Sequence, residues 1–385
     1  PHELSNGICS LNPNVNRLAM SCIMEIDNQG RIVHSDIFES VIRSRIQMTY
    51  KKVNQILEEN IVPEGYEDYK DDLLLMNLVS DLLRKKMNNR GYIDFDIDEG
   101  KIIVNEKGEA IDVVLRERGT GEKLIENFMI AANEAVAETF NFMSMPLIYR
   151  VHGEPSEEKM LTFFRLLYVL KYKIKTNTKK LTPKTIQQVL LELKGKKEFY
   201  ILSNQLLRSM QKAEYSATNI GHFGLASKYY CHFTSPIRRY PDLMVHRAIK
   251  KCILNENINL EVVNSFEKRL PSIAEHSSLK ERMSVDCERD VDKMKKAEYM
   301  EKHIGEEYDG VITGVTNFGF FVQLPNSVEG LVKVEDLKDD FYRYDESTFS
   351  LVGDHKKNKY TLGDEVRVKT VAASKLTSTV DFEIV

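Results

Sequence analysis

Two adjacent arginines, Arg238 and Arg239, are the residues whose type and position most directly suggest chemistry. Residues 242–251, which follow them, have helical apolar spacing, so both guanidinium groups lie just before a helix N-terminus. Free N–H groups, the helix dipole and two planar cationic forks together suit a phosphate group. The alternative is a structural pair bonded to carbonyl oxygens or to Asp242. An arginine pair taken alone favours that alternative.

The stretch around these arginines, residues 221–249, reads GHFGLASKYYCHFTSPIRRYPDLMVHRAI. Its two prolines break the chain twice, so residues 237–240 are expected to form a loop or a single turn. The ordered run HFTSPIRRYPDLMVHRAI resembles the signature of the ribonuclease II / ribonuclease R (RNB) family. The resemblance implies processive, metal-dependent hydrolysis of single-stranded RNA from its 3′ end to nucleoside 5′-monophosphates. It also implies that Arg238 contacts the phosphate at the scissile end and stabilises developing charge, with Arg239 as a further RNA contact.

Four other positions match family residues in the RNA channel, and each has a plainer interpretation. Three of them are predicted to lie on helices, and the fourth, Phe95, lies in a predicted strand. Tyr50, at the first position of a helix capped by Thr49, is as well explained by packing. Glu126 shares a helix face with Asn133, and spacing alone favours a solvent-facing pair. Glu288 lies among charged residues on the polar side of a helix, and ordinary i,i+4 pairing on the helix surface explains most of them. The resemblance implies that Tyr50 and Glu126 line the RNA path and that Glu288 is catalytic.

Phe95 lies in the alternating run YIDFDID of residues 92–98. Alternation predicts a strand with Ile93, Phe95 and Ile97 on the core face and three aspartates on a solvated face, turning at 99–100 into a partner strand at 101–104. On that pattern Phe95 belongs to the core. The resemblance implies instead that Phe95 stacks on a base near the RNA 3′ end, a contact that tolerates any base. The aspartates could suggest a metal site, but a solvated strand face explains them better.

Composition describes an ordinary soluble protein with more than one domain. The chain has 385 residues, 42% of them hydrophobic and 29% charged, and a net charge of −4. Such a charge is not typical of a nucleic-acid binder, so RNA binding would need a local basic channel. The five cysteines include no CxxC pair and fit a reducing cytoplasm, and no apolar run approaches membrane-spanning length. We therefore expect a cytoplasmic monomer without membrane contact.

The remaining pattern predicts mixed helices and strands over residues 1–304. A β-hairpin is expected over residues 17–46, and helices over 50–59, 69–90, 122–140, 242–251 and 271–304, with more helices between 156 and 215. Thr182 and Pro183 predict a capped helix start. The segment LSNGICSLNP of residues 4–13 also resembles the family, so the resemblance spans essentially the whole chain.

Residues 305–385 change to short alternating strands with glycine turns, and resemble the S-one-type OB fold named after a ribosomal protein. Phe318 and Phe321 match its base-stacking positions. Lys333 replaces a common histidine, keeping a positive contact while losing a ring, and Arg343 lies in an aromatic-basic run. The fold class is therefore α+β: an N-terminally truncated RNB-type catalytic domain, 1–304, followed by a small all-β OB barrel, 305–385.

The family's metal-binding aspartates follow the pattern D-x5-D-x-D-D, which this sequence lacks. The resemblance implies Mg²⁺ for a parent enzyme, held by carboxylates outside this chain. Since the chain begins at Pro1, we interpret it as a fragment and expect it to bind single-stranded RNA without hydrolysing it. The alternative is a non-catalytic RNA-binding module of a translation or RNA-decay factor. The presence or absence of the upstream aspartates would distinguish the two.

Overall fold

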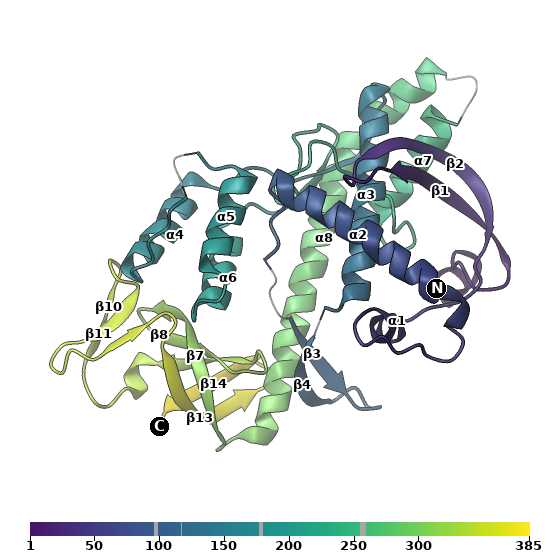
Figure 1. Cartoon of the computed structure of the whole chain (residues 1–385). Coiled ribbons are helices and arrows are strands. Elements are labelled where there is room, and N and C mark those ends of the chain that lie inside the picture. The colour runs from purple at the N-terminus through teal and green to yellow at the C-terminus, as the bar shows by residue number, and fades with distance from the viewer. Residues whose placement is uncertain (96–98, 117, 177–179, 255–258) are drawn as a thin grey trace.

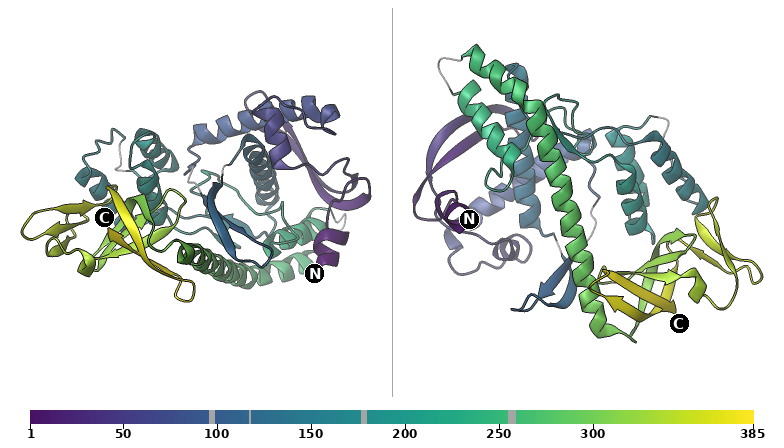
Figure 2. Two further views of the ribbon diagram at one scale, coloured as in Figure 1. Left: turned by 90° about the horizontal axis from the view of Figure 1, so that it is seen from below. Right: turned by 180° about the vertical axis from the view of Figure 1, so that it is seen from behind.

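The computed structural model describes residues 1–95, 99–116, 118–176, 180–254 and 259–385. Figure 1 shows a helix-rich part that carries the N-terminus and a small β-rich part that carries the C-terminus, with one long helix, α8, running from the first to the second. The same helix crosses the back of the molecule in Figure 2. Residues far apart in sequence meet along it, so α8 (Leu260–Met300) organises the site.

The chain begins with a short helical segment (Glu3–Ile8) and the antiparallel hairpin of β1 (Asn16–Ile26) and β2 (Ile32–Arg43), which confirms the predicted hairpin. Gly30 closes its turn with a φ of 74°. A Cβ at this position would lie 2.4 Å from the backbone oxygen of Leu82, so the turn requires glycine. The hairpin thereby contacts the next long helix directly.

Three helices follow and pack together: α1 (Tyr50–Leu57), α2 (Lys70–Arg90) and α3 (Thr120–Phe142), with a 3-10 turn at Glu67–Tyr69. Each was predicted within a few residues. Thr49 caps α1 by accepting a hydrogen bond from the Lys52 N–H, and Gly91 ends α2 with a φ of 107°. Figure 1 shows α2 crossing in front of α3.

The strand prediction for residues 92–98 is wrong where the structure describes it. Residues 92–95 form no strand, and residues 96–98, which include Asp96 and Asp98, lie outside the described residues. The hairpin instead joins β3 (Glu99–Val104) to β4 (Ala110–Arg116) around Gly108, whose φ is 76°. Alternation alone could not show that Asn105 and Gly108 supply better turn chemistry than residues 99–100.

Helices α4 (Glu157–Val169), α5 (Pro183–Leu193) and α6 (Phe199–Ser209) form a separate bundle next to the β-rich part (Figure 1). The predicted start of α5 is confirmed, since Thr182 accepts a hydrogen bond from the Thr185 N–H and proline follows. The core of this bundle includes Leu362 of the β-rich part, with Val311 and Phe349 packed against it. The bundle and the β-rich part are therefore joined by apolar contact.

Helix α7 (Tyr240–Cys252) packs on the first part of α8, and the short strands β5 (Tyr149–Val151) and β6 (Glu214–Ser216) pair beside them. The predicted start of α8 at Pro271 is wrong, because the helix begins at Leu260 and contains Pro271. Buried Leu270 and Ala274 pack on either side of the proline. Tertiary packing thus outweighs the helix-breaking tendency of proline.

After a 3-10 turn (Glu301–His303), five strands close into a barrel in the order β13-β14-β9-β8-β7. The strands are β7 (Glu307–Thr316), β8 (Gly319–Gln323), β9 (Glu329–Lys333), β13 (Glu365–Ser374) and β14 (Thr379–Ile384). Between β9 and β13 lie a 3-10 turn (Val334–Asp336) and a small sheet of β10 (Tyr342–Asp345), β11 (Ser350–Gly353) and β12 (Lys359–Thr361). This confirms the α+β fold with an OB-like barrel.

The barrel core extends into the helical part. Phe320 and Phe382 are fully buried in it, and so are Ala297 and Met300 from the end of α8, together with Val113 of β4. The predicted domain boundary between residues 304 and 305 stays a prediction. None of the helices among the described residues is long and apolar enough to cross a membrane.

Candidate nucleic-acid interface

The loop that carries the two arginines is held by buried and partly buried hydrogen bonds at both of its ends. At Phe233, the backbone N–H donates to Oδ1 of Asn133 at 2.9 Å, and the carbonyl oxygen lies 2.8 Å from Nε2 of His246. Asn133 and His246 come from α3 and α7, so both helices fix the start of the loop. Desolvation by burial lowers the pKa of His246, and the hydrogen bond to the Phe233 carbonyl oxygen offsets part of this effect.

At the other end of the loop, Asp242 is fully buried and accepts two hydrogen bonds on Oδ1. The donors are the Ser235 N–H at 2.7 Å and Nη2 of Arg239 at 2.8 Å. Arg239 therefore makes the structural contact that was the alternative interpretation of the arginine pair. Its predicted contact with RNA stays a prediction, and this geometry favours a supporting role.

Arg238 is placed differently, because its side chain is exposed and lines a groove between the start of α7 and α8. The groove has a volume of about 810 Å³ and includes Glu288, Lys280 and Tyr240 on its walls. Among the described residues, no ion-pair partner of Arg238 is present. The structure thus brings the two predicted catalytic residues, Arg238 and Glu288, to one cavity, while their roles stay predictions.

A partly buried network in the wall of this groove was not predicted. The Arg150 guanidinium pairs with Glu281, and its Cζ lies 4.6 Å from the ring centroid of Tyr215. The Tyr215 hydroxyl lies 2.9 Å from Nδ1 of His232. Both Glu281 and Tyr215 line the groove. Arg150 reaches them only because β5 pairs with β6, and no local pattern in the sequence signals this long-range pairing.

Burial keeps the histidines of this region neutral. Desolvation lowers the pKa of His232 to about 2, assisted by the charges of Arg239 and Arg150. Desolvation likewise lowers the pKa of His222 to about 3, with His152 as the next cause. His222 and His232 both lie edge-on to the ring of Tyr230. The imidazoles are thus neutral parts of a packed aromatic core, and the groove's positive charge comes from arginine and lysine.

The other predicted residues of the RNA channel do not line the groove that contains Arg238. Tyr50 is 46% exposed at the start of α1. Glu126 pairs with Arg118 and accepts a hydrogen bond from the Tyr92 hydroxyl at 3.4 Å. Phe95 is half-buried and packs against the core of the α4–α6 bundle. Their RNA contacts stay predictions, and for Phe95 the packing supports the core interpretation.

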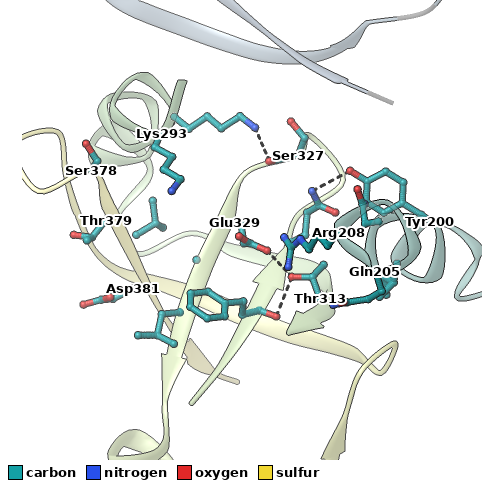
Figure 3. A pocket seen from close by; sticks show the side chains of 18 residues that line it. Tyr200, Gln205, Arg208, Lys293, Thr313, Ser327, Glu329, Ser378, Thr379 and Asp381 are labelled. Atoms are coloured by element: carbon teal, nitrogen blue, oxygen red, sulfur yellow. Dashed lines mark hydrogen bonds between the residues drawn. The ribbon is translucent and has the colours of Figure 1, made fainter. Parts of the chain in front are cut away.

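A second groove separates α6 from the barrel (Figure 3). Tyr200 and Arg208 face it from α6, Lys293 from α8, and Phe321 from β8. The Tyr200 hydroxyl accepts a hydrogen bond from Nε2 of Gln323 at 3.4 Å. This groove combines aromatic and cationic side chains, the combination that holds single-stranded nucleic acid.

A third cavity connects the two grooves along α8. Glu288 and Val285 belong both to it and to the groove of Arg238, while Tyr200 and Lys296 belong both to it and to the groove beside the barrel. Three adjoining cavities therefore form a row along α8 between the barrel and Arg238, and this row is called the passage below. Sequence spacing predicts such a helix face but not which elements cover it.

The predicted residues of the β-rich part have side chains that are at least partly exposed. Phe318 is 51% exposed, and its ring centroid lies 6.2 Å from that of Phe321, edge to face. Lys333 is paired with Asp381 at 2.9 Å. Arg343 lies on β10, in the small additional sheet, and pairs with Asp354 at 2.8 Å. Base stacking by the two phenylalanines stays a prediction, and each of the two cations already has a carboxylate partner.

In the described ranges, no group of three or more histidine, cysteine, aspartate or glutamate side chains is arranged to hold a metal ion. Asp94 is engaged by the Arg84 guanidinium. The residues described thus do not fit the carboxylate cage that Mg²⁺ requires.

Comparison with known proteins identifies two regions. Residues 1–255 match the RNB domain, and residues 301–384 match the S1 RNA binding domain. Ribonuclease R 1 of Lactococcus lactis is 44% identical over 384 residues, which are 100% of this chain and 47% of that protein. Ribonuclease R of Thermotoga maritima is 45% identical over 390 residues, 100% of this chain and 54% of its own length. The chain spans about half the length of these relatives.

The structure is also similar to solved structures of RNase R from Mycoplasma genitalium. The one in complex with ribose methylated single-stranded RNA superposes with a TM-score of 0.95 at 30% identity, over 100% of this chain and 60% of that one. The one in complex with double-stranded RNA gives a TM-score of 0.87 at 28% identity, over 100% of this chain and 63% of that one. Fold and sequence therefore point to the same family.

Proposed function

The chain belongs to the RNB (ribonuclease II / ribonuclease R) family, and on that premise we propose that it is the RNA-gripping part of a processive 3′→5′ exoribonuclease. The passage along α8, with Phe321 at one end and Arg238 at the other, carries this proposal. A single strand follows it with its 3′ end toward Arg238. Bases stack on exposed rings of the barrel. Cationic side chains bind the phosphates, and neither contact depends on the base sequence.

Arg238 contacts the phosphate at the scissile end, where its guanidinium stabilises the charge that develops during hydrolysis. Glu288, at the junction of two cavities, orients the terminal nucleotide. Asp242 holds Arg239 and the loop backbone in place, so Arg238 needs little reorganisation when RNA arrives. The Arg150–Glu281 pair supports the groove wall from behind. The immediate product is a nucleoside 5′-monophosphate.

Metal-assisted hydrolysis requires a cluster of carboxylates that holds the metal ion. The described residues contain no such cluster. We place the Mg²⁺ ligands outside this chain, in the aspartate pattern that the family carries. Bound there, Mg²⁺ would supply an activated water and neutralise the leaving oxygen. The functional unit is proposed to be cytoplasmic and monomeric, and this chain alone to bind RNA without cleaving it.

The test uses a fusion polypeptide that joins this chain to the upstream segment of the Lactococcus lactis relative. A 5′-labelled oligoadenylate should be shortened stepwise, with the label staying on the shrinking RNA. A 3′-labelled oligoadenylate should release labelled mononucleotide in the first turnover. A folded fusion polypeptide that binds both substrates and shortens neither would favour the non-catalytic RNA-binding module. Release of mononucleotide from the 5′ end would contradict the proposed direction.

A further inference from the structure

The groove of Arg238 does not end where the passage from the barrel reaches it. From Glu288, where two cavities meet, it continues along α8 through Lys280 to Ser272. At about 1.5 Å per residue, the stretch from 288 to 272 is about 24 Å long. Its far end points away from the barrel, since the barrel lies at the C-terminal end of α8 (Figure 2). A cavity of about 810 Å³ is within the range that holds a small ligand.

Apart from the exposed carboxylate of Glu288 at its near end, the charged groups that remain available in this part of the groove are cationic. Glu281 is engaged by Arg150, and Arg239 by Asp242. Lys280 is exposed, and within the described part of the chain its only hydrogen-bond contact is the Met283 sulfur at 3.9 Å. Lys280 and Arg238 are thus two accessible cationic groups on the same groove. An anion with more than one negative charge would be favoured there.

The same stretch also offers an aromatic surface. Tyr240, the first residue of α7, is 48% exposed and lines the groove next to Pro241. Its ring is therefore free to stack on a planar ligand, and stacking on an aromatic ring tolerates every base. Tyr215, the other aromatic residue of the groove, is buried and its face is covered by Arg150. One stacking surface and two cations match the parts of a nucleotide.

We propose that the groove beyond Glu288 is a product site that binds the released nucleoside 5′-monophosphate, with Lys280 on its phosphate and Tyr240 on its base. The proposal rests on the proposed function. In hydrolysis a water oxygen bonds to phosphorus, the bond from phosphorus to the 3′ oxygen of the preceding nucleotide breaks, and that oxygen takes up a proton. The released phosphomonoester carries a charge of about −1.5 to −2 at pH 7, whereas each backbone phosphodiester carries one.

This difference in charge gives a role to the second cation, Lys280, in the groove of Arg238. A phosphodiester needs one guanidinium contact, whereas the product gains a further contact from Lys280. The product therefore moves to the side of the groove away from the incoming strand, and Arg238 becomes available for the next phosphate. An ordered exit of this kind fits a processive enzyme, in which the shortened strand stays in the passage.

The experiment titrates this 385-residue chain with adenosine 5′-monophosphate, adenosine and inorganic phosphate, and follows binding by isothermal calorimetry. The chain should bind the monophosphate more tightly than either other probe. Lys280→Gln should weaken binding of the monophosphate by about three-fold without affecting adenosine, as loss of one exposed charge contact implies. Tyr240→Ala should weaken both. Lys268→Gln, which removes an exposed lysine of α8 outside the groove, is the matched control and should change nothing.

Equal binding of inorganic phosphate and the monophosphate would mean that only an anion is recognised, and would overturn the product site. Equal weakening by Lys280→Gln and Lys268→Gln would do the same, and so would the absence of any binding. The same samples are titrated with oligoadenylate. RNA binding without monophosphate binding refutes this inference alone, whereas monophosphate binding without RNA binding refutes the proposed function.

Discussion

Arg239 and Asp242 form a buried ion pair, with 2.8 Å between Nη2 and Oδ1, on the loop that presents Arg238. Asp242 is fully buried and also accepts the Ser235 N–H, so one carboxylate fixes both a side chain and the backbone. Removing one partner of a buried pair leaves an uncompensated charge and costs about 3–5 kcal/mol. The pair therefore contributes to holding the loop in the conformation that presents Arg238.

We predict that Asp242→Ala lowers the free energy of unfolding by about 3 kcal/mol or more. The measurement is urea denaturation followed by circular dichroism. Arg31→Ala is the control, because it removes an exposed pair with Asp27 and should cost less than about 1 kcal/mol. Equal, small effects of both substitutions would mean that the buried pair contributes little.

The buried histidines predict a loss of stability on mild acidification. His232 and His222 have pKa values of about 2 and about 3 in the folded chain, because burial disfavours their charged forms. The unfolded chain takes up these protons near pH 6.5, so the unfolded state binds more protons and stability falls as the pH drops below 6.5. The loss continues until the pH reaches the folded pKa values.

We therefore expect the unfolding free energy to fall between pH 6.5 and pH 5, by up to about 1.4 kcal/mol per pH unit for each such histidine. His232→Gln should remove about one histidine's share of this slope. His276→Gln, which changes an exposed histidine of α8, should leave the slope unchanged. A slope that is the same in all three proteins would contradict the assignment to His232.

Local signals in the sequence predicted most elements, because caps and apolar spacing act over a few residues. Thr49 and Thr182 cap the helices that they were expected to cap. Two predictions failed where packing decided the outcome. The start of α8 precedes Pro271, and residues 92–95 form no strand while Asp94 pairs with Arg84.

The candidate site was predicted only in part. The arginine loop was visible as a motif, and so was its position before a helix. The contacts of Arg150 with Tyr215 and Glu281 depend on the pairing of β5 with β6, across residues that no spacing rule connects. Glu288 and Arg238 line the same groove because of the way α8 is rotated against α7. Periodicity gives the face of a helix but not the neighbour that covers it.

Stacking on the barrel predicts a selective loss of RNA affinity. Phe318→Ala combined with Phe321→Ala should weaken binding of oligoadenylate by this chain about ten-fold or more, since each base stack is worth about 1–3 kcal/mol. Substitution is preferable to removal of residues 305–385, because Ala297 and Met300 belong to the barrel core. Fluorescence anisotropy measures the affinity. Tyr168→Ala, an exposed aromatic residue on α4, should not change it.

Arg238 is predicted to act on the rate more than on binding. In the fusion polypeptide, Arg238→Ala should slow single-turnover hydrolysis by about 10²-fold or more, because a charged contact in the transition state is lost. RNA affinity should fall far less. Arg282→Ala, an exposed arginine on α8 outside the groove, is the control. An unchanged rate in Arg238→Ala would make this arginine structural.

Without any upstream segment, this chain is expected to bind RNA but not to cleave it. It should bind single-stranded RNA through the barrel and the passage along α8, yet leave the RNA intact in Mg²⁺ or Mn²⁺. Among the described residues, no cluster of carboxylates is arranged to hold a metal ion. Arginines cannot generate hydroxide near neutral pH in its place. The measurement is incubation with end-labelled oligoadenylate followed by gel analysis. Shortening that persists in Arg238→Ala would come from a contaminating nuclease. Shortening that disappears in Asp96→Asn would instead place a metal site within residues 94–98 and refute this prediction.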